Sequence, residues 1–534
     1  MKKVYRGGAL ALSLLIGLAV GACGGEEKKK ASAFSSIAYT GVETVTDLNK
    51  YHADVTVGSI GNDDPVDNGI INCLYYSLEI NGKKVPVYTT RCAQSLHSFA
   101  WVDATEVDGE IILDVEISTE KTYESVLVLP ESRGVEATLK GQKVNATVNG
   151  YGSFSFVFDK GPEEALTLYV APKEALNVPE GWKTETFDPG KYTQEETNFT
   201  ESNTAYVFKA GRYELSSVNV PSDSILYFEP GTYVEVYSEG DNDRQSALKS
   251  HGTKNVTVAG RALFDFSASQ GGDAKIKGVY SFNNVDGASF SGVTTINSNN
   301  WSLCFTDSND VEISRCMFFG YRTYSDGIML SDCQDSGAKY CFVRTGDDAI
   351  ETKSTGTEYT ENILYEYNAV WTDKARGYGV IYEANHNKQN VTFRNCSIGF
   401  ALPTWSDYLG CCCVSMGDNK KAVWQDIYFE NIEVYKNDCA LLNITLKDDY
   451  MSGTGGGQAK NIYFSNVTSK RCYGVPLRIN VQAGGTLGQV FLDNIRYNGK
   501  TVEEGDINDK DILSIANVNS GWSKTRNVKI NTLG

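Results

Sequence analysis

Three aspartates in two short segments have the residue type and spacing for acid–base chemistry. Asp326 lies in residues 325–330, and Asp347 and Asp348 lie side by side in residues 346–353. Asp326 and Asp347 are 21 residues apart, about one turn of a repeating β fold, which would bring their backbones to about 4.8 Å. Carboxylates that close resist joint ionisation, so the pKa of at least one should rise and keep it protonated as a general acid.

Asp347 and Asp348 can act together only if the chain departs from a regular strand at this point. Neighbouring residues on a strand point to opposite faces, so one of the two would otherwise enter the core. Gly346 favours a turn, strand end or bulge, where both side chains can reach the outer surface. The simpler interpretation is that all three aspartates only cap turns.

A repeat over residues 201–534 predicts the fold that would position these aspartates. The segment 208–213 recurs at 228–233, and a second motif, Asn or Asp before an alternating apolar run, begins at Asn255, Asp310, Asn362, Asn390, Asp426, Asn461 and Asn527. A strand-and-turn unit of this period cannot bury its apolar face alone, so it stacks on copies of itself. We predict an all-β chain with a right-handed parallel β-helix. A β-propeller is the alternative, but one dominant strand per repeat fits four-stranded blades poorly.

The preceding residues 38–178 carry a different pattern, that of short alternating strands. The runs 53–57, 76–80 and 153–158 are examples, and Asn81-Gly82 predicts a hairpin with a type I′ turn. This pattern predicts an N-terminal antiparallel β-sandwich. Residues 179–200 lack periodicity and are predicted to form a linker. Cys73 and Cys92 could pair within the sandwich, and the sequence leaves this open.

The first residues predict export. A basic start and a short apolar run in residues 1–22 are typical of a signal peptide. Cys23 follows small residues, as in a bacterial lipobox, so we expect lipid modification there and a flexible tether over residues 23–37. An ordinary cleaved signal is the alternative. These features predict an exported bacterial lipoprotein of the outer membrane or cell surface, held to the membrane by its N-terminal lipid, with no transmembrane helix.

The composition excludes one class of partner. With 67 acidic and 49 basic residues the formal charge is −18, which argues against nucleic-acid binding. The run Cys411-Cys412-Cys413 is unusual, but neighbours on a strand face opposite ways and cannot easily bind one metal. We therefore predict no metal site.

On these motifs the chain resembles the dextranase and isopullulanase type of glycoside hydrolase, family 49. The resemblance rests on Asp326-Gly327, on 347–350 (Asp-Asp-Ala-Ile) one coil later, and on a β-sandwich before a β-helix; family 28 polygalacturonases are more distantly similar. It implies cleavage of α-glucosidic links with inversion, by Asp347 as general acid and by Asp326 and Asp348 as the groups that hold and deprotonate water. It implies no metal or cofactor.

Departures from family 28 favour a neutral substrate. Polygalacturonases carry Gly-His-Gly and Arg-Ile-Lys motifs that contact the acidic sugar, whereas this chain has neither, and Arg478-Ile479-Asn480 stands where the basic tripeptide would be expected. We expect a monomer that acts on a neutral, dextran-like α-glucan. The alternatives are a family-28-like hydrolase of a pectic or other polymer and a non-catalytic glycan-binding solenoid.

Further residues on neighbouring coils are candidates for contacts with sugar rings or hydroxyls. An aromatic ring there is as readily explained by packing under a loop, and a lysine by a solvated charge or by pairing with a catalytic carboxylate. The predicted substrate-binding residues are Lys353, Arg376, Tyr378, Tyr382, Trp301, Trp371 and Trp405.

Overall fold

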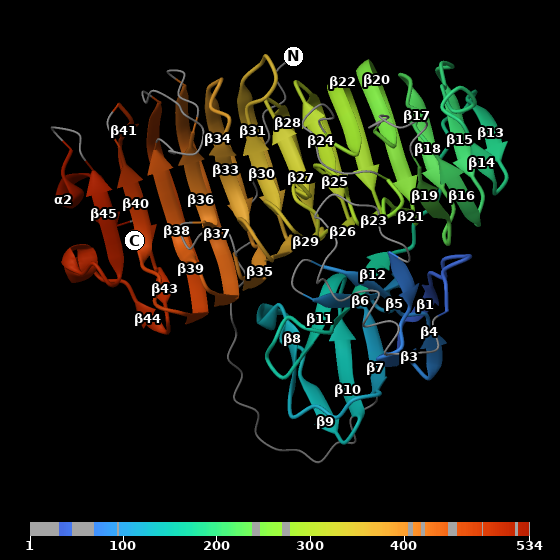
Figure 1. Ribbon diagram of the computed structural model, residues 1–534, viewed down its shortest axis with the longest axis horizontal. Helices are drawn as coiled ribbons and strands as arrows, with labels where there is room; N and C mark the ends of the chain where they lie inside the picture. Colours follow the sequence, from blue (N-terminus) through green and yellow to red (C-terminus); the bar gives the residue numbers. More distant parts are fainter. Residues whose placement is uncertain are drawn as a thin grey trace. The chain divides into compact units, whose positions relative to one another are not determined.

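The structure is a computed structural model that describes residues 31–44, 69–92, 95–237, 246–269, 278–403, 409–417, 422–446, 457–482, 484–517 and 522–532. In these residues the regular secondary structure is almost entirely β-strand, and the strands form a sandwich followed by a parallel β-helix (Figure 1). Both belong to one compact unit that begins at Ala31. The predicted strand at 53–57 lies outside the described residues.

Two sheets form the sandwich. The first has the order β2 (Ile70–Asn72), β5 (Tyr88–Arg91), β6 (Leu96–Thr105), β12 (Ala165–Pro172), β11 (Gly152–Phe158) and β8 (Val126–Leu129), with β1 (Ala33–Ser36) paired to β6. The second has the order β4 (Lys83–Val85), β3 (Tyr76–Ile80), β7 (Ile112–Thr119), β10 (Lys143–Asn149) and β9 (Ala137–Lys140). A 3-10 turn, η1 (Glu131–Arg133), follows β8.

The sandwich confirms the predicted hairpin, corrects two details and settles the state of two cysteines that the sequence left open. Asn81 and Gly82 both have positive φ, at 49° and 73°, as a type I′ turn between β3 and β4 requires. The sandwich is not purely antiparallel, because β6 and β12 pair in parallel. Strand β1 lies inside the segment 23–37 that was predicted to be a tether. Cys73 and Cys92 are both free thiols.

The β-helix has three faces, each a ladder of parallel strands. The first face contains β13 (Lys183–Phe187), β15 (Thr204–Phe208), β18 (Ser224–Phe228), the later parts of β20 (Leu248–Gly260) and β22 (Tyr280–Ser291), β25 (Asn309–Ser314), β28 (Gln334–Lys339), β31 (Thr360–Glu366), β34 (Lys388–Arg394), the first parts of β37 (Val423–Asn437) and β39 (Gln458–Cys472), β42 (Val490–Asp493) and β46 (Val528–Ile530).

The second face contains β14 (Lys191–Tyr192), β16 (Arg212–Leu215), β19 (Tyr233–Val236), β21 (Leu263–Asp265), β23 (Thr294–Ile296), β26 (Met317–Phe319), β29 (Phe342–Thr345), β32 (Ala369–Thr372), β35 (Ser397–Ala401), the later parts of β37 and β39, and β43 (Arg496–Tyr497). The third contains β17 (Val218–Asn219), the first parts of β20 and β22, β24 (Leu303–Thr306), β27 (Ile328–Ser331), β30 (Ile350–Lys353), β33 (Tyr378–Tyr382), β36 (Gly410–Met416), β38 (Ala440–Leu446), β40 (Leu477–Val481) and β45 (Leu513–Asn517). Short elements near the C-terminus are β41 (Thr486–Leu487), β44 (Lys500–Thr501), η3 (Glu504–Asn508) and α2 (Lys524–Asn527).

The recurring Asn or Asp of the sequence repeat marks the corner between the third and first faces. Residues 310, 335, 362, 390, 426 and 461 all have positive φ there, a conformation that Asn and Asp tolerate better than other side chains. Their side chains hydrogen-bond along the column, for example from Asn362 to Asp335 at 2.8 Å and from Asn390 to Asn362 at 2.7 Å. The motif therefore supplies both the turn and the bond between coils.

The solenoid begins earlier than the repeat predicted. Strands β13 and β14 lie within residues 179–200, the predicted linker, and pair in parallel with β15 and β16. These two strands are short and mostly exposed, so they lack the apolar alternation that marks later coils.

The second face is buried on both sides because the sandwich packs on its outer surface. Outward residues from Tyr233 to Tyr435 form one apolar cluster with sandwich residues that include Phe99 and Trp101. Two buried arginines cross this contact. Arg261 pairs with Asp103 at 2.8 Å, and the Arg344 guanidinium, which pairs with Asp373 of the next coil, also bonds sandwich groups.

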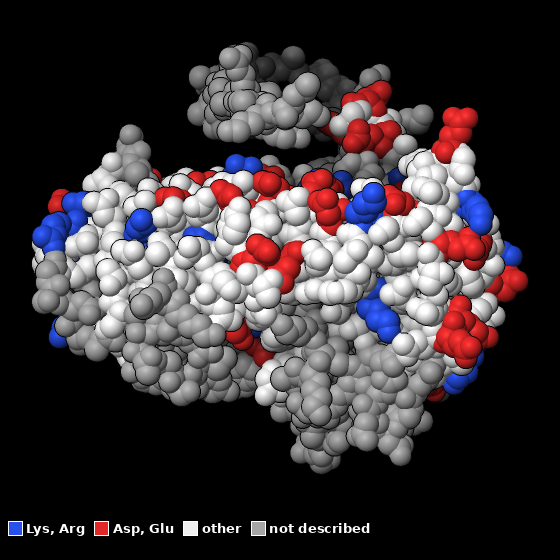
Figure 2. Space-filling view, turned by 90° about the horizontal axis from the view of Figure 1, so that it is seen from above, with Lys and Arg blue, Asp and Glu red and all other residues white. Residues whose placement is uncertain are grey.

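Charge is spread thinly over the surface. On the face shown in Figure 2, acidic and basic side chains are interspersed with wide uncharged areas. Among the described residues, no helix has the length and apolar character needed to cross a bilayer.

Candidate active site

The turns from the second face to the third carry the predicted aspartates on successive coils. Asp326 precedes β27, and Asp347 and Asp348 lie between β29 and β30, so the pair sits in a turn, the condition that Gly346 suggested. The β27–β30 register matches Ile328 with Ile350, and the Gly327 amide donates to the Asp348 carbonyl at 2.9 Å. Asp348, rather than Asp347, is therefore the neighbour of Asp326 in the next coil, a correction of one residue to the predicted spacing.

Glycines allow these turns to stack closely. A Cβ on Gly327 would lie 2.2 Å from the Ala349 carbonyl oxygen, and one on Gly346 would lie 2.8 Å from the Arg322 carbonyl oxygen. Both distances are too short for a side chain. The glycine beside each aspartate thus sets the distance between the carboxyl groups.

A buried cation contacts each of the two stacked aspartates. Lys353 Nζ donates to Asp326 Oδ2 at 2.7 Å. The Arg376 guanidinium donates to both oxygens of Asp348 at 3.2 Å, and its backbone N–H bonds Asp348 Oδ1 at 2.9 Å. The predicted contact of Lys353 with one of the candidate aspartates is therefore present. Asp326 Oδ1 is buried, and the Glu351 side chain is in hydrogen-bond reach of the Asp326 carboxyl.

Asp347 differs from its two neighbours in its environment. Its Oδ1 accepts the Asp348 backbone N–H at 2.9 Å, and no Lys or Arg is in direct contact with its carboxyl among the described residues. It is also the most exposed of the three, at 7% against 1% for Asp326 and 3% for Asp348. Burial, followed by the nearby charges of Asp326 and Asp348, raises the pKa of Asp347 well above its ordinary value. The geometry thus favours a protonated carboxyl at the surface edge of the cluster.

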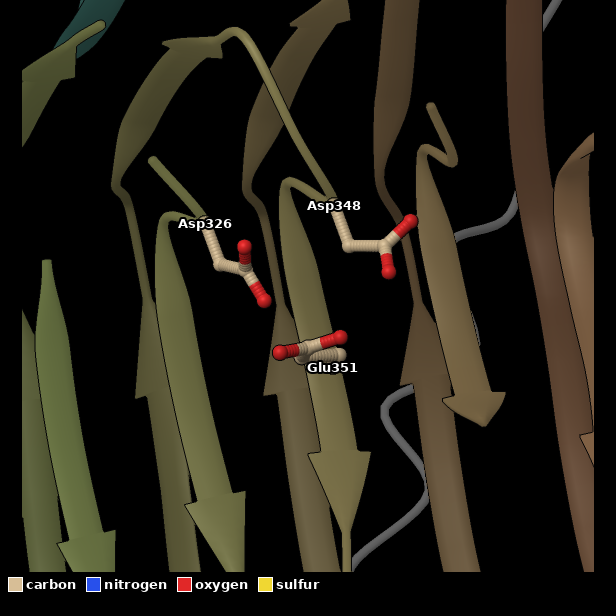
Figure 3. A group of neighbouring side chains, drawn as sticks. All are labelled: Asp326, Asp348 and Glu351. Atoms are coloured by element: carbon tan, nitrogen blue, oxygen red, sulfur yellow. The ribbon is translucent and has the colours of Figure 1, made fainter. Parts of the chain in front are cut away.

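Glu351, which was not predicted, is the fourth carboxyl of this cluster. Figure 3 shows Asp326 and Asp348 at the entries of neighbouring strands, with Glu351 farther along β30. Lys353 Nζ lies 2.9 Å from Glu351 Oε1, and the Glu351 side chain is fully buried. The sequence held a signal for it, because Glu351 and Lys353 alternate on the outward face of β30 beyond Asp348.

The cluster has the spacing of a cation site, but the chain supplies its own cations. One oxygen each from Asp326, Asp348 and Glu351 lies within 4.8 Å of the others. Lys353 and Arg376 already contact these carboxyls and compensate their charge. The donor set therefore has the chemistry of an acid–base site with internal counterions.

Charge balance indicates which carboxyls are neutral. Four buried carboxyls share the site with two cations, and two unpaired negative charges would be costly to bury. Burial raises the pKa of Glu351 and that of Asp347 well above their ordinary values. It also raises the pKa of Asp326, and Lys353 opposes the rise at all three carboxyls. We infer that Asp347 and Glu351 hold the protons at neutral pH.

Replacing Glu351 with glutamine tests this assignment. Because a protonated glutamate and a glutamine have the same charge and nearly the same shape, we expect the free energy of unfolding at pH 7 to change by no more than about 1 kcal/mol. Urea unfolding of the Glu351→Gln variant measures this free energy. A large loss of stability would show that Glu351 is ionised and that Lys353 depends on it.

Two other predicted contacts lie at the cluster. The Lys353 ammonium lies 4.7 Å from the centre of the Trp301 ring, which is partly exposed. The Tyr382 ring lies 4.3 Å from the Arg376 guanidinium, and its hydroxyl accepts a hydrogen bond from that group. Each aromatic ring therefore lies beside a cation that contacts one of the candidate aspartates.

Tyr378 and Trp371 were predicted wrongly. Tyr378 faces inward on β33, is fully buried, and places its hydroxyl 2.9 Å from the Asn368 carbonyl oxygen. Trp371 faces outward on β32, but the sandwich covers it, and its ring packs against Arg344 and His97. Trp405 and the proposed lipidation site Cys23 lie outside the described residues.

An exposed aromatic residue near the cluster was also missed. Tyr324, two residues before Asp326, is 50% exposed and has a φ of 64°. A tyrosine in this conformation is rare, and such outliers concentrate at functional sites. A sequence carries no sign of a positive φ at a tyrosine, so this signal required the structure.

Comparison with known proteins agrees with the fold. No protein-family model and no curated protein sequence matches the chain. Among solved structures, Dex49A from Penicillium minioluteum matches with a TM-score of 0.65 at 13% identity, over 88% of this chain and 96% of that one. A polygalacturonase from Erwinia carotovora ssp. carotovora has a TM-score of 0.48 at 15% identity, over 65% and 98%. The catalytic unit of a family 87 α-1,3-glucanase from Streptomyces thermodiastaticus has a TM-score of 0.42 at 10% identity, over 85% and 83%.

The first of these likenesses shows a parallel β-helix preceded by a β-rich domain, the fold of β-helix glycoside hydrolases. The predicted relationship to family 49 is confirmed at the level of the fold.

Proposed function

We propose that the protein is an inverting glycoside hydrolase that cleaves α-glucosidic links of a neutral, dextran-like polysaccharide. The observation that carries this proposal is the stacked pair Asp326 and Asp348, each held by its own cation, beside a neutral Asp347. Solved glycoside hydrolases of the same fold support it.

In this mechanism Asp347 is the general acid. Its proton lies at the exposed edge of the cluster, from which it can pass to the glycosidic oxygen as the bond to the anomeric carbon breaks. The ionised carboxylates of Asp326 and Asp348 make loss of that proton unfavourable before substrate binds, so Asp347 stays protonated. After the transfer, the Asp347 carboxylate is left for reprotonation by water.

Asp326 and Asp348 would hold the attacking water. Asp326 is held by a hydrogen bond from Lys353, and Asp348 is fixed by three hydrogen bonds from Arg376. One of the two carboxylates accepts the proton as the water oxygen bonds the anomeric carbon from the face opposite the leaving group, which inverts its configuration.

The counterions favour a neutral substrate. Lys353 and Arg376 contact the cluster, but each is already paired with a carboxylate of the protein. The carboxylate of a uronate would therefore add negative charge to a site in which both cations are already paired with protein carboxylates. A family-28-like action on another polymer remains the second candidate, because the backbone fold serves both.

Product analysis tests the reaction and its stereochemistry together. We expect the purified protein to release sugars from dextran, and the first anomer seen by proton NMR to be β, because inversion converts an α link into a β product. Polygalacturonate and galactan are the comparison polymers. Release of the α anomer first would refute inversion, and release of sugar only from polygalacturonate would refute the neutral substrate.

We also propose that the chain is exported and carries a lipid on Cys23. The support is the sequence of residues 1–23 alone. Membrane attachment would then hold a monomeric hydrolase near polysaccharide outside the cell.

A further inference from the structure

A cavity of about 780 Å³ lies between the sandwich and the β-helix, away from the aspartates. Its solenoid wall follows the corner between the first and second faces, whereas the aspartates occupy the corner between the second and third. The volume is within the range of sites that hold small ligands. The cavity is therefore a separate feature of the molecule.

One column of corner residues forms the solenoid wall. Strand register places Arg315, Tyr340 and Tyr367 at the same position of successive coils, followed by Asn395, Asn431 and Asn466. All six have positive φ, between 53° and 56°. Asn suits this conformation, whereas Arg and Tyr are disfavoured in it.

A corner of these coils can form without Arg or Tyr side chains. At the other Asn-rich corner, the same coils carry Asp310, Asp335 and Asn362, all with positive φ. Residues held against their conformational preference concentrate where they have a function. Arg315, Tyr340 and Tyr367 line the cavity, so the residues that are disfavoured at positive φ lie where the cavity is.

These side chains form a stack, and the last aromatic ring of the stack, that of Tyr367, is partly exposed. The Arg315 guanidinium lies 5.5 Å from the centre of the Tyr340 ring, and the rings of Tyr340 and Tyr367 are 5.1 Å apart and 7° from parallel. Tyr367 is 43% exposed. The next residue in the column, Asn395, is shorter than a tyrosine, so the outer face of the Tyr367 ring extends beyond it.

Hydrogen-bonding groups continue from that ring. Asn431 donates to Asn395 at 3.0 Å and Asn466 donates to Asn431 at 3.0 Å, so each amide in the ladder keeps another N–H and another lone pair. On the sandwich side, Arg133 lines the cavity, and its guanidinium has no hydrogen-bond or ion-pair partner among the described residues. An open aromatic face beside amides and a guanidinium suits a ring that has apolar faces and hydroxyl edges.

We propose that this cavity binds a segment of neutral polysaccharide, with one sugar ring stacked on Tyr367 and its hydroxyls bonded by the Asn395–Asn431 ladder and Arg133. The site would hold the polymer while another part of it enters the aspartate cluster. The choice of α-glucan as the ligand rests on the proposed function; the existence of the site does not.

The test compares two tyrosine substitutions in the full chain carrying Asp347→Asn, which prevents turnover. Tyr367→Asn removes the ring and places an amide where the ladder accepts one, so folding should be retained. Tyr463→Thr is the matched control, since Tyr463 stacks on Tyr428 at 4.7 Å but does not line the cavity. Binding is measured by retardation in native gels that contain dextran, α-1,3-glucan or polygalacturonate.

We expect dextran or α-1,3-glucan to retard the parent protein, and Tyr367→Asn to weaken binding by about tenfold, as loss of an aromatic anchor does. Tyr463→Thr should bind as the parent does. Equal binding by both variants, an equal loss in both, retardation only by polygalacturonate, or none by any polymer would overturn the proposal. Hydrolysis by wild type is measured separately: binding through Tyr367 without hydrolysis would refute the proposed function and leave this site standing.

Discussion

Replacing Asp347 with asparagine should lower hydrolysis by about 10²- to 10⁴-fold while the chain stays folded, because general acid catalysis contributes on that scale. Asparagine has the shape of the protonated side chain and can still accept the Asp348 backbone N–H, but it has no proton to give. Sugar release from dextran measures the effect. Asp335→Asn is the control, since Asp335 also lies at a corner and accepts a hydrogen bond from Asn362 that an amide can accept. Comparable losses in both variants would remove Asp347 from the mechanism.

The same substitution should change how stability depends on pH. The folded-state pKa of Asp347 is raised well above the value of about 3.9 expected in the unfolded chain, so above that pH the folded state binds more protons than the unfolded state. The stabilising proton is then fully present below about pH 4, and its contribution is lost as the pH rises through the folded-state pKa. Wild type should thus lose more stability than Asp347→Asn between pH 5 and pH 8 in urea unfolding, and parallel curves would contradict a protonated Asp347.

Replacing Arg344 with methionine should have the largest effect on stability, a loss of about 3–5 kcal/mol, because it leaves a buried carboxylate without its cation. The Arg344 and Asp373 side chains are both fully buried and lie 3.1 Å apart. The guanidinium also bonds the Ser95 hydroxyl and His97, whose pKa is held well below its ordinary value by burial and then by Arg344. A neutral His97 can accept that bond.

Hydrolysis should fall as well in the Arg344→Met variant. Arg344 is three residues before Asp347, and Asp373 is three residues before Arg376, so the ion pair joins the two turns that carry site residues. Urea unfolding and sugar release measure the two effects. Lys143→Met is the control: its partner Glu116 is at 2.6 Å, but the pair is exposed and should contribute about 0–1 kcal/mol. Equal effects of the two substitutions would contradict the role given to Arg344.

The sequence predicted the features that depend on local backbone conformation. Asn81-Gly82 has few alternatives to a hairpin, and the recurrent Asn and Asp of the corners mark coils because few residues tolerate positive φ. Gly346 likewise indicated the turn that exposes Asp347. Features that depend on what packs outside the coil were not predictable: alternation does not show that a second domain covers Trp371.

Register and charge compensation also required coordinates. A spacing of about one coil could not distinguish Asp347 from Asp348 as the neighbour of Asp326, because one residue is within the variation of coil length. Glu351 was missed because its membership of the cluster depends on its contact with Lys353, which in turn contacts Asp326 on the adjacent coil.

The sandwich also bears on how the β-helix unfolds. Coils of a solenoid contact only their neighbours, so such folds can lose coils progressively from one end. Here a single globular domain packs along the second face from Tyr233 to Tyr435, with the coils that carry Asp326 and Asp348 between those limits. Because this domain contacts many coils at once, loss of any one of them would disrupt the packing of the others. The coils that carry Asp326 and Asp348 should therefore unfold together with the sandwich in one cooperative step, whereas the coils beyond β39, where Lys470 pairs with Glu131 of the sandwich, should unfold more readily.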